Sequence, residues 1–117
     1  MSTSTSQSRR SNHSGRAILL AALLAGTPGA AAAVDATRQA ELTRLVRQDC
    51  GSCHGMTLKG GLGKPLLPET LDALAADSIA SIILEGVPGQ PMPPWKGLLS
   101  AEDAGWIATK LKQGFPQ

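Results

Sequence analysis

The chain has 117 residues, enough for one domain, and carries 11 basic and 9 acidic side chains. Three of the basic residues (Arg9, Arg10 and Arg16) and none of the acidic ones lie in the first 33 positions. The remainder therefore has a net charge of −1. That balance gives no support to nucleic-acid binding, which needs a basic domain.

The N-terminal segment has the order of a secretory signal peptide. A polar, basic stretch ends at Arg16, an apolar run covers residues 17–25, and a tract of small residues follows. We expect residues 1–33 to be the signal peptide and residues 34–117 to be the mature domain.

Two other interpretations of this segment have less support. The apolar run is about half as long as the ~20 residues of a membrane-spanning helix, which disfavours an uncleaved membrane anchor. The pair Arg9-Arg10 suggests twin-arginine export, but the residues that follow, Ser11, Asn12 and His13, are polar and do not support it. The sequence therefore favours ordinary export to the periplasm.

The first expected helix covers residues 36–49. Asp35 is a suitable N-terminal cap, and Leu42, Leu45 and Val46 fall on one face of the helix. A cysteine-containing segment ends this helix.

The middle of the chain is predicted to be loop followed by a second helix. Residues 56–68 are rich in Gly and Pro, which favours a loop, and residues 69–75 form at most a weak helical turn. The second helix is expected over residues 78–85, with Asp77 as its cap and Gly86 at its C-terminal end.

Residues 87–95 contain four prolines and cannot form a helix. Ser100 and Asp103 resemble a capping box that opens a last helix over residues 101–112. Gly105 lowers the stability of that helix by about 1 kcal/mol relative to Ala, which predicts a close crossing there by the first helix. The predicted fold class is all-α, with three main helices and no strand.

Cys50, Cys53 and His54 form the Cys-x-x-Cys-His sequence that attaches c-type haem. Two cysteines three residues apart at a helix end point the same way, so both thiols can bond to one porphyrin. The adjacent imidazole then lies under the iron. A domain this small also needs a cross-link or a bound group to stabilise its small core, and a covalently bound haem c provides one.

Three other interpretations of the cysteine pair are weaker. A thioredoxin-type pair follows a strand and precedes a helix, whereas here a helix precedes and a Gly-rich loop follows. A zinc site lacks a fourth ligand, because the other histidine, His13, leaves with the signal peptide. A plain disulfide would close too short a loop to be useful.

Met92 is the candidate for the second axial ligand of the iron. No second histidine remains in the mature chain, and Met56 is too close to His54 to reach the opposite face of the haem. The prolines around Met92 stiffen the loop that presents its thioether. The alternative is that Met92 only packs under this loop.

Other side chains are expected near the site. The backbone carbonyl of Lys64 or Pro65 should accept a hydrogen bond from His54, and the choice between them stays open. Trp95 either donates to a haem propionate or only packs. Lys59, Lys64 and Lys96 either form a docking ring for an acidic partner or are ordinary solvated lysines. Seven apolar residues could form the wall of the pocket, although each is more safely assigned to the core than to a haem contact: Leu66, Leu67, Leu71, Leu74, Ile79, Ile83 and Leu98.

The order of helix, haem motif, Gly/Pro loop, helix, methionine loop and last helix resembles the class I cytochromes c. The resemblance covers residues 36–112 and implies an all-α fold whose first and last helices cross near the haem. It also implies thioether bonds at Cys50 and Cys53, with His54 and Met92 as axial ligands.

Two longer stretches, residues 50–63 and 83–95, resemble the small cytochrome c55X proteins associated with the nitrite reductase of denitrification. This resemblance implies a periplasmic electron carrier for the haem c/haem d1 nitrite reductase. An accessory role in haem d1 maturation is the alternative. A five-coordinate gas sensor or enzyme has less support, because no His, Tyr or second acidic cluster stands near Met92 in the sequence to act as acid or base.

Overall fold

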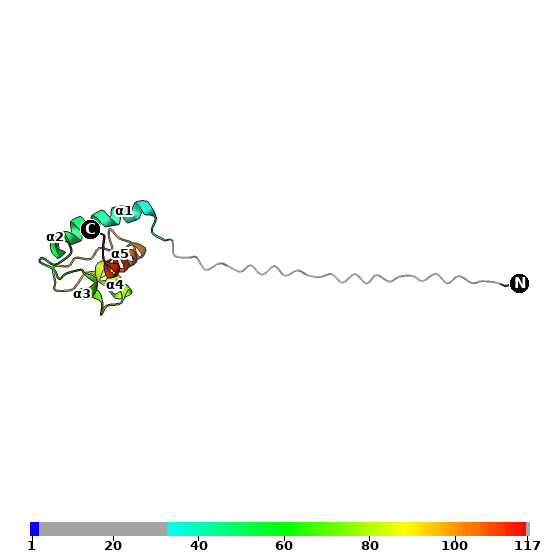
Figure 1. The fold of residues 1–117 in the computed structure, drawn as a ribbon. Coiled ribbons are helices and arrows are strands. Elements are labelled where there is room, and N and C mark those ends of the chain that lie inside the picture. Colours follow the sequence, from blue (N-terminus) through cyan, green and yellow to red (C-terminus); the bar gives the residue numbers. More distant parts are fainter. Residues whose placement is uncertain (3–32, 117) are drawn as a thin grey trace.

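The computed structural model describes residues 1–2 and 33–116, and within these ranges the chain is helical and has no strand (Figure 1). The expected all-α class is confirmed. The expected signal peptide falls almost wholly on residues 3–32, outside the described residues. The helical elements are α1 (Ala36–Leu45), η1 (Val46–Cys50), α2 (Gly51–His54), α3 (Pro68–Leu71), α4 (Ala76–Glu85) and α5 (Ala101–Gln113).

The first helical segment is longer than predicted. α1, η1 and α2 follow one another without a break, so the helix runs through the cysteines to His54 instead of ending near Asp49. Asp35 caps it as expected, because its carboxylate accepts a hydrogen bond from the backbone N–H of Arg38 at 2.9 Å. The five-residue element η1 is a π-helical turn, a feature that often occurs at functional sites. Gly55, with φ at 90°, ends the segment.

Helix α4 begins at Ala76, two residues before the predicted start. Its N-cap is Ala75, which makes no side-chain capping bond, so the prediction that Asp77 is the cap was wrong. Asp77 lies in the first turn, where its negative charge is still favourable beside the helix N-terminus. Ile79 and Ile83 are buried on the face that meets the core.

Helix α5 begins with the predicted capping box. The hydroxyl of Ser100 accepts from the backbone N–H of Asp103, whose carboxylate accepts from the backbone N–H of Ser100, both at 3.1 Å. Ile107 and Leu111 are buried, and the helix packs closely against α4. The predicted close crossing at Gly105 was wrong, because a Cβ there would meet no atom within 4 Å.

Lys112 joins the end of α5 to the segment that contains α3. Its ammonium group donates to the backbone carbonyls of Leu71 and Asp72 at 3.1 Å and of Leu74 at 2.5 Å. All three donors of the lysine are therefore used. The helical turn expected over residues 69–75 is only the four-residue α3, and the lysine holds the chain that follows it.

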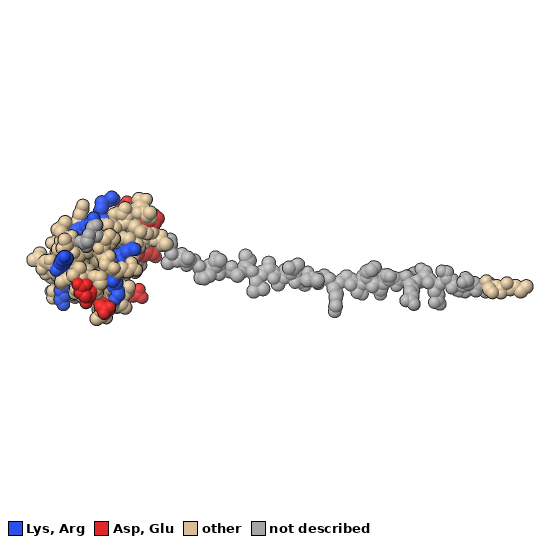
Figure 2. Space-filling view, in the orientation of Figure 1, with Lys and Arg blue, Asp and Glu red and all other residues tan. Residues whose placement is uncertain are grey.

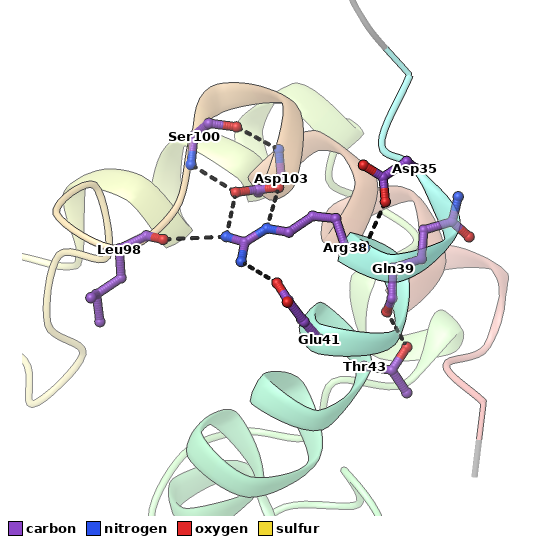
Figure 3. Close-up of polar contacts among 8 residues, drawn as sticks. All are labelled: Asp35, Arg38, Gln39, Glu41, Thr43, Leu98, Ser100 and Asp103. Carbon is purple, nitrogen blue, oxygen red and sulfur yellow. Dashed lines mark hydrogen bonds and ion pairs between the residues drawn. The ribbon is translucent and has the colours of Figure 1, made fainter.

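Arg38 joins α1 to the start of α5 (Figure 3). Its guanidinium donates twice to the Asp103 carboxylate, at 3.1 and 2.8 Å, and also to Glu41 at 2.9 Å and to the carbonyl of Leu98 at 3.4 Å. Asp103 is only 7% exposed. The hydrogen bonds from Arg38 hold the pKa of the Asp103 carboxyl below its usual value.

The described helices share one apolar core, and the end of the chain returns to the first helical segment (Figure 1). Arg47 donates to the carbonyl of Pro116 at 2.8 Å, which ties this end in place. In residues 1–2 and 33–116, no helix reaches the length and apolar character needed to cross a membrane. The core consists of Leu42, Val46, Leu58, Leu71, Ile79, Ile83, Leu99, Ala104, Ile107, Ala108, Leu111 and Phe115.

Candidate functional site

A cavity of about 890 Å³ lies between the first helical segment, α4 and α5. Its volume is in the range of roughly 300–1,000 Å³ that small-molecule and cofactor sites occupy. The side chains of Cys50, Cys53, His54 and Met92 all belong to its lining, together with many apolar residues. The structure thus brings all four predicted site residues to one cavity.

The two cysteines lie one helical turn apart and are not bonded to each other. Burial raises the pKa of the Cys50 thiol to about 11, and the neighbouring carboxylate of Asp49 adds to the effect. Thiols that attack disulfides have a lowered pKa, so this environment does not suit a thioredoxin-type pair.

The imidazole of His54 is held at one nitrogen. Its Nδ1 lies 2.6 Å from the backbone carbonyl oxygen of Lys64, so the ring donates there and keeps Nε2 free to bind a metal. Of the two carbonyls that the sequence left open, Lys64 rather than Pro65 is the acceptor.

The loop after His54 folds back on the cysteine motif. The backbone N–H of Gly60 donates to the His54 carbonyl and that of Gly63 to the Cys53 carbonyl, both at 2.8 Å. Leu58, at φ 59°, turns its side chain into the core, where only 2% of it is exposed. The burial of this residue could not be predicted from the sequence, because nothing local distinguishes a buried leucine in a Gly-rich loop.

Met92 lies in the proline loop between α4 and α5 and is partly buried. Its carbonyl accepts a hydrogen bond from the backbone N–H of Val87 at 3.1 Å, which closes the loop. Beyond it, the backbone N–H of Trp95 donates to Ile83 at 3.1 Å and that of Lys96 to Leu84 at 3.2 Å. The last turn of α4 therefore positions the methionine loop.

The predicted apolar wall is largely confirmed. Leu67 is absent from the lining. Leu98 is also absent and is 70% exposed, so the assignment of Leu98 to the wall was wrong. Leu99 takes that place, because the turn that begins at Trp95 directs the second leucine inward. Trp95 lines the cavity and packs against the core. The predicted residues that do line the cavity are Leu66, Leu71, Leu74, Ile79 and Ile83.

The three candidate docking lysines, Lys59, Lys64 and Lys96, are all exposed, and Lys64 lines the cavity. Lys96 forms an ion pair with Glu85 at 2.9 Å, which reduces its charge toward a partner. Figure 2 shows basic and acidic side chains mixed on one face of the molecule. The docking ring therefore stays a prediction.

A metal held only by protein side chains has no support in the described ranges. Among residues 1–2 and 33–116, no three His, Cys, Asp or Glu side chains come together in a way that could hold a metal ion. The residues that line the cavity instead include Cys50, Cys53, His54 and Met92, which carry two thiols, one imidazole and one thioether. These are the groups that attach and ligate haem iron in c-type cytochromes, so the residues present fit that cofactor.

Comparison with known proteins gives a consistent picture. Residues 37–109 match the family described as cytochrome C oxidase, cbb3-type, subunit III. The chain is similar to a solved c-type cytochrome, NirC, with 55% identity and a TM-score of 0.67, over 68% of this chain and 94% of that one.

Two curated relatives are both named cytochrome c55X. The protein of Pseudomonas aeruginosa is 54% identical over 80 residues, which cover 68% of this chain and 67% of the relative. That of Paracoccus denitrificans is 50% identical over 96 residues, which cover 82% and 92%. A third relative, the dihydro-heme d1 dehydrogenase of Pseudomonas aeruginosa, is 37% identical over 73 residues, or 62% of this chain but only 15% of that enzyme.

Proposed function

Because the chain belongs to the cytochrome c55X family of mono-haem c-type cytochromes, which carry electrons in denitrification, we propose that it does so with His54 and Met92 as axial ligands. Its cofactor is one haem c, and the pair Cys50 and Cys53 fits covalent attachment. The proposed setting is the periplasm, reached through the signal peptide at residues 1–33.

One observation carries this proposal. His54, at the end of α2, and Met92, in the proline loop after α4, are far apart in the sequence, yet both line the cavity that the two cysteines border. A bound haem supplies an iron that changes between the ferric and ferrous states by one electron. Met92 as a thioether ligand favours the reduced iron relative to a second histidine.

The other residues of the site keep this centre in place and dry. Lys64 orients the imidazole through its carbonyl, and Val87 holds the backbone of Met92. We propose that the leucine and isoleucine residues of the cavity wall keep water from the iron when haem is bound. If His54 and Met92 both bound the iron, no position would be left on it for a substrate, so we propose that the protein is not an enzyme.

The proposed partner is a periplasmic redox protein, with the haem c/haem d1 nitrite reductase as the first candidate. A second role has a specific observation in its favour. The similarity to the cytochrome-like part of a dihydro-heme d1 dehydrogenase supports an accessory role in haem d1 maturation. Both roles use the same electron transfer and differ only in the partner.

The test of the ligand set is absorption spectroscopy of the oxidised, haem-loaded protein. The wild type should show a weak long-wavelength band from sulfur-to-iron charge transfer. Met92→Ala should lose this band and, after reduction to the ferrous state, bind carbon monoxide readily. Met56→Ala is the matched control, because Met56 is 67% exposed and absent from the cavity lining, and it should keep the band. Persistence of the band in Met92→Ala would overturn the assignment.

The two partner roles are separated by rapid-mixing kinetics. In one arm the reduced cytochrome is mixed with oxidised nitrite reductase, and in the other the oxidised cytochrome is mixed with the d1 dehydrogenase and dihydro-haem d1, whose oxidation releases electrons. Fast oxidation by the reductase supports electron delivery, whereas reduction of the cytochrome in the second arm alone supports the maturation role. Carbon monoxide or nitric oxide binding by the wild type would instead favour the gas sensor or enzyme.

A further inference from the structure

We propose that Gly63 is a positioning residue that sets the orientation of the His54 imidazole. The proposal rests on the proposed function, in which this ring is an axial ligand. It concerns which residue fixes the plane of the ring and, through it, the reduction potential.

The contact between the two residues is unusually close. A Cβ built on Gly63 would lie 2.7 Å from both Cε1 and Nδ1 of His54 and 3.3 Å from Cγ. Real Cβ atoms do not approach heavy atoms to 2.7 Å, so the glycine backbone lies directly against this edge of the ring. The φ angle of Gly63 is not in the left-handed region, so the position needs glycine for space and not for backbone conformation.

The loop cannot simply move away from the ring. The backbone N–H of Gly63 donates to the Cys53 carbonyl at 2.8 Å, and that of Gly60 donates to the His54 carbonyl at 2.8 Å. The next residue, Lys64, accepts the hydrogen bond from Nδ1 at 2.6 Å. Because the loop is fixed on both sides of Gly63, a methyl group there must displace the imidazole.

Displacement of the ring has a predictable effect on the iron. The hydrogen bond from Nδ1 to Lys64 raises the basicity of the imidazole, which stabilises the ferric state. A methyl group at Gly63 turns the ring plane and lengthens this bond. The ferric state then loses stability relative to the ferrous state, so the reduction potential rises.

The experiment compares haem-loaded wild type, Gly63→Ala and Gly97→Ala. Gly97 is the matched control, since it also lies in a loop, but a Cβ there meets nothing within 4 Å. We expect Gly63→Ala to favour the ferrous state about threefold to tenfold more than wild type, where tenfold corresponds to about 59 mV for one electron. Gly97→Ala should leave the potential unchanged.

Nuclear magnetic resonance provides a measurement that distinguishes a role in positioning the imidazole from a general effect on stability. In the ferric protein, the pattern of paramagnetically shifted haem methyl signals reports the orientation of the imidazole plane. This pattern should change in Gly63→Ala and stay as in wild type in Gly97→Ala. An unchanged potential and an unchanged pattern in Gly63→Ala would contradict the proposal.

A measurement on wild type alone covers the case in which Gly63→Ala does not load haem. The Nδ1–H of His54 should exchange slowly with solvent, because Gly63 covers that edge and the carbonyl oxygen of Lys64 accepts the hydrogen bond. Rapid exchange would overturn the proposal. An error in the proposed ligand set would give a different result from an error in the role of Gly63. In that case the sulfur-to-iron band would be missing in wild type or retained in Met92→Ala.

Discussion

Gly86 is a second position at which the site depends on the absence of a side chain. Its φ is 69°, in the left-handed region. A Cβ there would lie 2.7 Å from the carbonyl oxygen of Met92 and 2.8 Å from backbone atoms of Pro93 and Pro94. Unlike at Gly63, the atoms that would be displaced are backbone atoms, so any substitution affects the path of the methionine loop.

Gly86→Ala is therefore expected to lower the free energy of unfolding by about 1–3 kcal/mol. The sulfur-to-iron band should also weaken. Gly105→Ala, the same substitution in the middle of α5, should raise stability by about 1 kcal/mol, because its Cβ meets nothing and glycine is a poor helix former. Thermal unfolding measures both effects, and equal melting temperatures for the two variants would contradict this view of Gly86.

Asp103 is the buried partner of Arg38, and we expect Asp103→Asn to cost about 2 kcal/mol at pH 7. The pKa of this carboxyl is lowered in the folded state by the Arg38 hydrogen bonds. Its contribution is therefore fully present above the unfolded value of about 4 and is lost as the pH falls through the folded value.

Urea unfolding at several pH values tests this sign. The difference in stability between wild type and Asp103→Asn should be constant near neutral pH and should shrink as the pH falls below about 4. Glu85→Gln is the control, because its ion pair with Lys96 is exposed and should contribute less than about 1 kcal/mol. A difference that grows on acidification would exclude the assigned role of Asp103.

At the scale of the helices, the sequence predicted elements well where the signal was local. The caps at Asp35 and Ser100 were correct, because each side chain bonds a backbone N–H three residues away. The prediction that Asp77 caps α4 was wrong. The helix begins earlier because the backbone N–H of Ile79 bonds to the carbonyl of Ala75, which gives Asp77 a helical position.

Contacts between distant segments could not be predicted from the sequence. Lys112 bonds to carbonyls 38 to 41 residues earlier in the chain, and no pattern around it indicates this. The choice between Leu98 and Leu99 for the cavity wall likewise depends on the turn at Trp95. The π-helical turn η1, immediately before the cysteine motif, has no recognisable local signal either.

Lys112→Met is expected to destabilise the protein by about 1–3 kcal/mol. The methionine keeps most of the apolar stem, but three backbone carbonyls lose their donor. Leu71 and Leu74, which line the cavity, should become more mobile, and hydrogen exchange should be faster in this segment.

Lys110→Met is the control for this prediction. Lys110 is on the same helix, but it lies over the ring of Trp106 at 5.8 Å and contributes at most about 1 kcal/mol. Equal unfolding free energies for the two variants, with unchanged exchange at residues 71–74, would show that the hydrogen bonds of Lys112 do not support the cavity wall.

At the scale of the whole molecule, the sequence predicted four residues that the structure brings to one cavity, but not the shape of that cavity. The cysteine motif is local, and Met92 remained as the axial candidate after Met56 was excluded by its position. The cavity that unites them is built from α4, α5 and two loops, and it emerges only in the folded chain. Whether Lys64 or Pro65 accepts the hydrogen bond from His54 depends on a shift of one residue along the loop, which the spacing in the sequence cannot decide.

The cavity also explains why so small a domain needs its cofactor. Ile83 and Leu111 belong to the core and also line the open cavity of about 890 Å³, and leaving it unfilled would deprive this side of the core of packing partners. Covalent attachment at Cys50 and Cys53 makes the haem a permanent part of that core. Stability and electron transfer therefore depend on the same group.

The most direct test of this account is mass spectrometry of the exported protein, made in a cell with a working haem-attachment system. The account predicts the added mass of one haem, located on the peptide that contains Cys50 and Cys53, and its loss when both cysteines are changed to serine. A wild-type polypeptide that carries no haem under these conditions would contradict it.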